Sequence, residues 1–107
     1  MKPIFYGGRN MYGVVMHDSM RELLTREFIL VYGKTKGETA ENAWNKLKSE
    51  FKETENYLSD LEFDDGCEVT KKSFIKSVID NEDNEDGVLI SLPEYLYIKL
   101  FKIPNEI

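Results

Sequence analysis

The stretch Gly33-Lys34-Thr35 holds the glycine, lysine and hydroxyl with which a phosphate-binding loop ends. That motif also needs a glycine five residues earlier. This chain has Phe28 at that position, inside an apolar run that leaves no room for a loop of backbone amides around a phosphate. We therefore expect a turn between a strand and a helix, and no nucleotide site.

His17, Asp18 and Ser19 are the residue types of a serine-hydrolase triad, but they are consecutive. Neighbours on a strand end point in different directions, so they cannot form the relay from nucleophile to base to orienting carboxylate. The single cysteine, Cys67, and the single histidine, His17, allow a Cys-His nucleophile. The carboxylates beside Cys67 would raise the pKa of its thiol. We predict no catalytic residue and no enzymatic activity.

A calcium loop is the metal site that the composition approaches most closely. With Gly87 aligned on the invariant glycine of such a loop, Glu82, Asn84 and Asp86 take the first, third and fifth positions. The twelfth position must be a bidentate glutamate, and here it is Pro93. One histidine and one cysteine are too few for a zinc site. We predict no metal and no cofactor.

The strongest chemical feature of the chain is an uneven distribution of charge. The net charge is −6, with +3 in residues 1–49, −10 in residues 50–94 and +1 in residues 95–107. Acidic side chains gather in two connections on either side of one short amphipathic segment. They are Asp60, Glu62, Asp64, Asp65 and Glu68 in the first connection and Asp80, Glu82, Asp83, Glu85 and Asp86 in the second.

A negative surface of this size repels nucleic acid and speeds the approach of a basic protein. We predict that these carboxylates bind a partner, and that the chain is an inhibitor or immunity-type protein. It would cover a basic surface of a nuclease, a toxin or another nucleic-acid-handling protein. Two alternatives stay open. In the first, the acidic loops only keep the protein in solution. In the second, the domain binds a small molecule, or serves as an enzyme subunit, through a pocket between sheet and helices that uses tyrosines and His17.

The elements that carry these residues follow from apolar periodicity. Residues 27–32 predict a strand that is buried on both faces in the middle of a sheet, because the run after Glu27 is uncharged and rich in β-branched and aromatic side chains. Residues 39–58 predict a helix that begins at Thr39 as N-cap. Its apolar stripe is Ala40, Ala43, Trp44, Leu47, Phe51 and Leu58. Its water-facing residues are Glu41, Lys48, Glu50 and Lys52.

Residues 71–80 predict a second, short helix capped by Thr70. Residues 88–92 and 95–103 predict two strands, either paired as a hairpin or continuous with a bend at Pro93.

The N-terminal third predicts further strands. Residues 2–6 and 11–16 flank a glycine turn and predict a hairpin. Residues 20–25 suit either one helical turn or, as we favour, the first half of a strand that continues to residue 32 and pairs with 11–16.

Together these elements predict an α+β fold for residues 1–107 as a single domain. The sheet has about five mostly antiparallel strands and packs against two helices, at 39–58 and 71–80. Lys99 and Lys102 interrupt the last strand, which is typical of a sheet edge. A single cysteine and the absence of a long apolar segment favour the cytoplasm.

Overall fold

The fold was analysed in a computed structural model that describes residues 11–18, 21–92 and 95–103. Within these residues the chain forms five strands, two α-helices and one 3-10 helix, η2. In chain order they are β1 (Met11–His17), β2 (Phe28–Gly33), α1 (Lys36–Glu53), η2 (Leu58–Asp60), β3 (Glu62–Phe63), α2 (Lys71–Asp80), β4 (Val88–Leu92) and β5 (Leu96–Ile103). The predicted α+β fold is confirmed.

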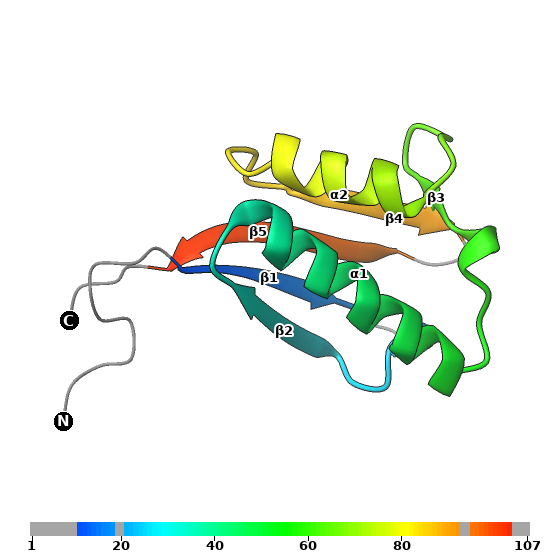
Figure 1. The fold of residues 1–107 in the computed structure, drawn as a ribbon. Coiled ribbons are helices and arrows are strands. Elements are labelled where there is room, and N and C mark those ends of the chain that lie inside the picture. The colour runs from blue at the N-terminus through cyan, green and yellow to red at the C-terminus, as the bar shows by residue number, and fades with distance from the viewer. Residues whose placement is uncertain (1–10, 19–20, 93–94, 104–107) are drawn as a thin grey trace, which may run out of the picture.

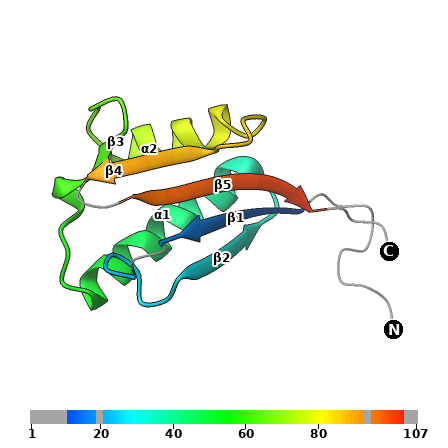
Figure 2. The ribbon, with the colours of Figure 1, turned by 180° about the vertical axis from the view of Figure 1, so that it is seen from behind.

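The strands form one antiparallel sheet in the order β2-β1-β5-β4-β3. Both helices lie on the same face of this sheet (Figure 1). Seen from behind, the strands lie in front of both helices (Figure 2), so the described part of the chain leaves the second face open. The fold therefore has two layers, with a core on one side of the sheet.

Antiparallel pairing agrees with the predicted neighbours in two places. β1 pairs with β2 from Tyr12 opposite Gly33 to His17 opposite Phe28. β4 pairs with β5, so of the two alternatives for the last two strands the structure has the hairpin.

The core lies between the helices and the covered face. Five of the six side chains of the predicted α1 stripe are buried, and Leu58 is partly buried. The Trp44 ring packs against Phe74 of α2, with 5.2 Å between ring centroids. Phe74 and Val78 bury the inner side of α2, which has the predicted bounds and the predicted cap at Thr70. The apolar stripe of α1 thus packs against both the sheet and α2.

α1 begins earlier than predicted. Its N-cap is Thr35, whose hydroxyl accepts a hydrogen bond from the Glu38 N–H at 3.0 Å. Thr39, the predicted cap, is fully buried inside the helix. A side chain at Gly33 would clash with Thr39, so this glycine lets the first turn of the helix lie directly on β2.

α1 also ends earlier than predicted. The helix stops at Glu53 with Thr54 as C-cap, and Glu55 adopts a left-handed backbone conformation with φ 61°. The chain turns there, so Leu58 belongs to η2 and not to α1.

Glu50 was predicted to face water, and this is wrong. The residue is 5% exposed. Its Oε1 accepts a hydrogen bond from the Thr25 N–H at 2.5 Å, and its Oε2 lies 3.5 Å from Lys46 Nζ. Glu50 therefore anchors the β1–β2 connection to the helix.

β2 is an edge strand, which corrects its predicted place in the middle of the sheet. Its neighbour is β1 on one side, and no described strand lies on the other. Phe28, Leu30 and Tyr32 point to the open face and are 56%, 49% and 50% exposed. β2 therefore has apolar side chains on both faces of the sheet, although the helices cover only one face.

β5 is a central strand between β1 and β4, so its predicted place at an edge is also wrong. Lys99 does not protect an edge, because its ammonium reaches the backbone of the loop after α2. Lys102 is exposed near the end of the strand.

The segment 21–27 is a loop and not the predicted strand. The buried carboxylate of Asp18 accepts hydrogen bonds from the Leu23 N–H at 2.7 Å and the Leu24 N–H at 3.1 Å, which fixes the loop. The predicted strand at 2–6 lies outside the described residues, and β1 has β2 and β5 as its two neighbours.

Candidate functional site

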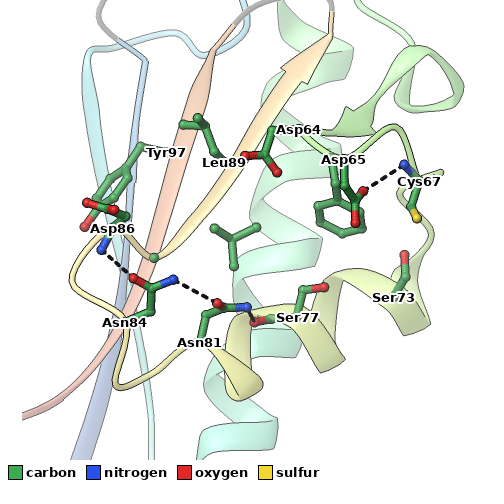
Figure 3. Close-up of a pocket in the computed structure, with 13 residues that line it drawn as sticks. Asp64, Asp65, Cys67, Ser73, Ser77, Asn81, Asn84, Asp86, Leu89 and Tyr97 are labelled. Atoms are coloured by element: carbon green, nitrogen blue, oxygen red, sulfur yellow. Dashed lines mark hydrogen bonds between the residues drawn. The ribbon is translucent and has the colours of Figure 1, made fainter.

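A groove of about 740 Å³ follows the outer side of α2 and the adjacent part of β4 (Figure 3). Ser73 and Ser77 of α2 line it together with Asn81, the C-cap of the helix. Val88 and Leu89 line it from β4. The groove therefore has polar side chains on the helix side and apolar ones on the strand side.

The two predicted acidic connections lie at opposite ends of this groove (Figure 3). Asp64 and Asp65 border it at the end near β3. Asp86 borders it at the other end, where the loop after α2 leads into β4. The fold thus places carboxylates that are more than twenty positions apart in the sequence along one groove.

The first acidic loop is a tight turn held by Asp65. Its Oδ1 accepts a hydrogen bond from the Cys67 N–H at 2.9 Å, and this bond lowers the pKa of Asp65. Gly66 supplies the left-handed conformation of the turn, with φ 90°. The interaction of the thiol of Cys67 with the Asp65 side chain and its negative charge raises the pKa of that thiol. The predicted effect of the acidic neighbours on Cys67 is confirmed.

The second acidic loop is held by a lysine from the centre of the sheet. Lys99 Nζ donates hydrogen bonds to the backbone carbonyls of Asn81 at 3.5 Å, Glu82, and Asn84 at 2.7 Å. The ammonium thus lies inside the loop, at three of its backbone carbonyls. The loop carries its own cation.

A chain of side-chain hydrogen bonds continues from α2 into this loop (Figure 3). Asn81 Nδ2 donates to the Ser77 carbonyl at 2.8 Å, and Asn84 Nδ2 donates to Asn81 Oδ1 at 3.1 Å. Asn84 Oδ1 then accepts from the Asp86 N–H at 3.0 Å. These bonds give the loop a fixed shape at the groove end.

Glu82 is directed away from the groove. Its Oε1 lies 2.5 Å from Lys36 Nζ in the first turn of α1, and this contact raises the pKa of Lys36. Glu82 therefore ties the loop to α1.

Of the nine predicted partner-binding residues, three line the groove: Asp64, Asp65 and Asp86. The other five besides Glu82 lie on the loops and elements nearby without lining it. They are Asp60, Glu62, Glu68, Asp83 and Glu85. The structure thus separates a groove-lining set from a set on the surrounding surface.

Several polar residues of the groove were not predicted, because they carry no charge. Ser73, Ser77 and Asn81 stand four residues apart, which places them on one face of a helix. Tyr97, which also lines the groove, donates a hydrogen bond from its hydroxyl to the Glu85 carbonyl at 3.2 Å. The four-residue spacing of Ser73, Ser77 and Asn81 could have been recognised in the sequence. The position of Tyr97 could not, because it depends on the pairing of β4 with β5.

The candidate nucleophiles are not brought together. The His17 ring stacks on Phe28 with 4.2 Å between centroids, and its Nε2 lies 3.1 Å from Glu27. Cys67 lines the groove at the β3 end of the sheet, and β5 and β4 lie between it and β1, which carries His17. No Cys-His pair forms.

The turn at 33–35 has the predicted structural role. The Lys34 N–H donates to Glu38 Oε1 at 2.9 Å, and Thr35 caps α1. These interactions engage the helix N-terminus with the protein's own side chains.

Among residues 11–18, 21–92 and 95–103, no three histidine, cysteine or acidic side chains come together as a metal-binding group. The helices in this part of the chain are too short or too polar to cross a membrane. Comparisons of the chain with family models, with curated proteins and with solved structures find no match.

Proposed function

We propose that the chain is a small acidic binding protein of the inhibitor or immunity type, which takes a basic segment of a protein partner into the groove beside α2. The partner would be a nuclease, a toxin or another nucleic-acid-handling protein with a basic surface. The observation that supports this proposal is the position of the two acidic loops at the two ends of one groove.

The geometry suits an extended basic segment. α2 has ten residues, so the acidic ends of the groove lie about 15 Å apart by helix rise. An extended chain of about five residues spans that distance. Two lysine or arginine side chains near the ends of such a segment could meet Asp64 at one end and Asp86 at the other. Apolar stems of the same side chains could lie on Val88 and Leu89.

The charges that remain available support a partner rather than an ion. Lys36 neutralises Glu82, and Lys99 occupies the backbone carbonyls of the second loop. Asp64, Asp65 and Asp86 have no lysine or arginine within ion-pair distance among the described residues. A partner's cations would supply the positive charge that the described residues do not.

The alternative of a small-molecule pocket between sheet and helices stays a prediction without a specific site. His17 and Tyr32 lie on the open face, away from the helices. Tyr57 and Tyr95 are 72% and 66% exposed. With a single cysteine in 107 residues, we expect the binding to occur in the cytoplasm.

Affinity capture from the native host with matched variants tests the proposal. The groove variant carries Asp64→Asn and Asp86→Asn. The control carries Glu53→Gln at the end of α1 and Glu55→Gln in the turn after it, both exposed, which removes the same charge outside the groove. We expect a stoichiometric basic protein on the wild-type and control columns and its loss from the groove-variant column.

Two results would contradict the proposal. One is equal retention of the basic protein by the groove variant and the control. The other is retention only of acidic or neutral proteins by the wild type.

A further inference from the structure

The sheet has an open face that neither helix covers (Figure 2). Side chains from β2, β1 and β5 form three rows across this face, because residues directly opposite each other in an antiparallel sheet lie on the same side. The strand register gives the rows as Tyr32, Gly13 and Phe101, then Leu30, Val15 and Lys99, then Phe28, His17 and Tyr97. Lys99 is the one member of these rows with a permanent charge.

The polar groups of the open face are engaged with the protein itself. The Lys99 ammonium donates to carbonyls of the loop after α2. His17 Nε2 lies 3.1 Å from Glu27. The Tyr97 hydroxyl donates to the Glu85 carbonyl. The surface that these rows leave for a ligand is therefore mainly apolar, and it presents little charge of either sign.

The aromatic rings of the open face rest against neighbouring residues. A Cβ atom at Gly13 would lie 2.6 Å from the Phe101 ring, so this ring lies over the backbone of β1. The Phe28 and His17 rings are stacked and parallel to within 9°. Side chains that are ordered in advance lose little conformational entropy when a second surface covers them.

The accessible area of the open face is sufficient for a small protein interface. Phe28, Leu30 and Tyr32 are about half exposed. Because an aromatic side chain buries about 150–250 Å² in full, these three leave roughly 300 Å² accessible. The partly exposed side chains of β1 and β5 on the same face add a comparable area. Two such faces packed together would bury roughly 1,200 Å², which is the lower end of specific interfaces.

We propose that a second copy of the chain packs on the open face, sheet against sheet, and that the protein forms a weak dimer with twofold symmetry. In such a dimer the same surface of both copies forms the contact. An apolar face would then meet an equally apolar face, at the separation of about 10 Å that packed sheets adopt. The small area predicts a dissociation constant in the micromolar range.

Charge and availability favour a second copy over other occupants. A nucleic acid or a charged peptide needs charges on the surface that it covers, and those of the open face are already engaged. Soluble monomers rarely leave a contiguous apolar patch of this size uncovered. A second copy matches the face in chemistry and is always present at the concentration of the chain itself.

The edge of β2 suits a second copy less well than the open face. Asn42 Nδ2 donates to the Tyr32 carbonyl at 2.8 Å, so part of the edge backbone is already bonded. The charged residues around this edge are balanced in number. They are Arg26, Lys34 and Lys46 on one side of the balance and Glu27, Glu38 and Glu50 on the other.

Sedimentation velocity of the full chain from about 1 µM to about 500 µM tests the proposal. We expect a monomer at the low end and a dimer at the high end. Each copy carries a net charge of −6, so the dimer should form more readily at high salt, where repulsion between the copies is screened. Binding of a basic partner in the groove should show the opposite dependence on salt.

Two variants and a matched control connect the dimer to the open face. Leu30→Lys and Tyr32→Lys each place a charge at a half-exposed position of β2, and each should weaken the dimer at least tenfold. Tyr57→Lys adds the same charge at a residue that is 72% exposed and lies outside the sheet, and it should leave the dimer unchanged. Circular dichroism of each variant checks that the fold is retained.

Nuclear magnetic resonance of a mixture of labelled and unlabelled chains distinguishes the face from the edge. Contacts between the two chains should appear from the Leu30 methyl groups to aromatic rings of the open face. A dimer without these contacts, in which amide exchange slows along β2, would assign the interface to the edge and overturn the proposal.

Three further results would also overturn it. One is a wild-type monomer across the whole concentration range. Another is equal weakening of the dimer by Leu30→Lys and Tyr57→Lys. The third is a monomer in which the Leu30 methyl groups contact residues 1–10 of the same chain, which would assign the open face to the chain's own N-terminal segment. The groove proposal is tested separately, by variants at Asp64 and Asp86.

Discussion

A single hydrogen-bonded pair, Asp65 and Cys67, decides what the thiol in the groove can do. Asp65 accepts a hydrogen bond from the backbone N–H of Cys67. Its side chain lies beside the thiol, and its negative charge opposes formation of a thiolate there. The pKa of the thiol is raised, and only the thiolate is a strong nucleophile. The exposed cysteine is therefore held in its unreactive form.

This predicts slow alkylation of Cys67. At pH 8 the folded protein should react with a thiol reagent severalfold more slowly than the chain unfolded in urea, where the influence of Asp65 is lost. Asp65→Asn should speed the reaction of the folded protein. A thiol that reacts faster in the folded state, or a loss of partner binding in Cys67→Ser, would contradict this interpretation.

Glu50 predicts a measurable pH dependence of stability. Burial alone would raise the pKa of its carboxyl, but the hydrogen bond from the Thr25 N–H and the charge of Lys46 outweigh burial and lower it. A carboxyl with a lowered pKa stabilises the fold above its unfolded pKa, and this contribution is lost as the pH falls through the lower folded pKa. Glu50→Gln should cost about 1 to 2 kcal/mol at pH 7.

Urea unfolding at pH 7 and below pH 4 measures this effect. The difference in unfolding free energy between wild type and Glu50→Gln should shrink toward the acid end. Glu53→Gln, at an exposed position three residues on, should show no such change. A constant difference across the pH range would show that Glu50 acts through shape and not through charge.

At the scale of elements, Trp44 is the side chain that joins the two helices. It is 7% exposed and packs against Phe74. Trp44→Ala should cost about 3 to 5 kcal/mol in thermal or urea unfolding, because it opens a cavity between α1, α2 and the sheet. Lys48→Ala, on the exposed side of the same helix, should cost less than about 0.5 kcal/mol.

Lys99 determines the shape of the loop after α2. Lys99→Met keeps most of the side-chain volume but leaves the carbonyls of Asn81, Glu82 and Asn84 without their ammonium partner, at a local cost of about 1 to 3 kcal/mol. A glutamate-specific protease should then cleave after Glu82 or Glu85 severalfold faster than in the wild type. Lys102→Met, at an exposed position on the same strand, should leave the cleavage rate unchanged.

The sequence was sufficient to predict the elements but not their places in the sheet. The hydrophobic periods of α1 and α2 and the apolar run of β2 follow from local side chains, which is why these elements were predictable. Which strands become neighbours depends on contacts between distant segments. An apolar run such as 28–32 suits either a central strand or an edge strand with an apolar open face, and composition cannot distinguish the two.

Buried charges were unpredictable for a similar reason. Asp18 and Glu50 are typical surface residue types, and each is buried because a backbone N–H from a distant or irregular segment donates to it. Lys99 looked like a residue that protects an edge, but its partners are carbonyls of a loop seventeen positions earlier. The acidic connections were found from the sequence, whereas the groove that links them required the pairing of β4 with β5.

At the scale of the whole molecule, the unbalanced negative charge lies at one end of the sheet. The α2, β3 and β4 end carries the acidic groove. At the β2 end, Arg26, Lys34 and Lys46 are matched in number by Glu27, Glu38 and Glu50. A basic partner would therefore approach from the α2 end, and β1 and β5 lie between the two ends.

Kinetics can separate the contribution of net charge from that of the groove. Asp64→Asn, Asp86→Asn and the control Glu53→Gln, Glu55→Gln change the net charge equally, from −6 to −4. Long-range attraction depends on total charge, so both variants should slow association with the captured basic partner at low salt, and this slowing should fade once the Debye length falls below about 8 Å. Direct contacts control dissociation, so only the groove variant should dissociate about tenfold or more faster, at any salt. Equal dissociation rates for both variants would mean that the acidic loops attract the partner without forming its binding site.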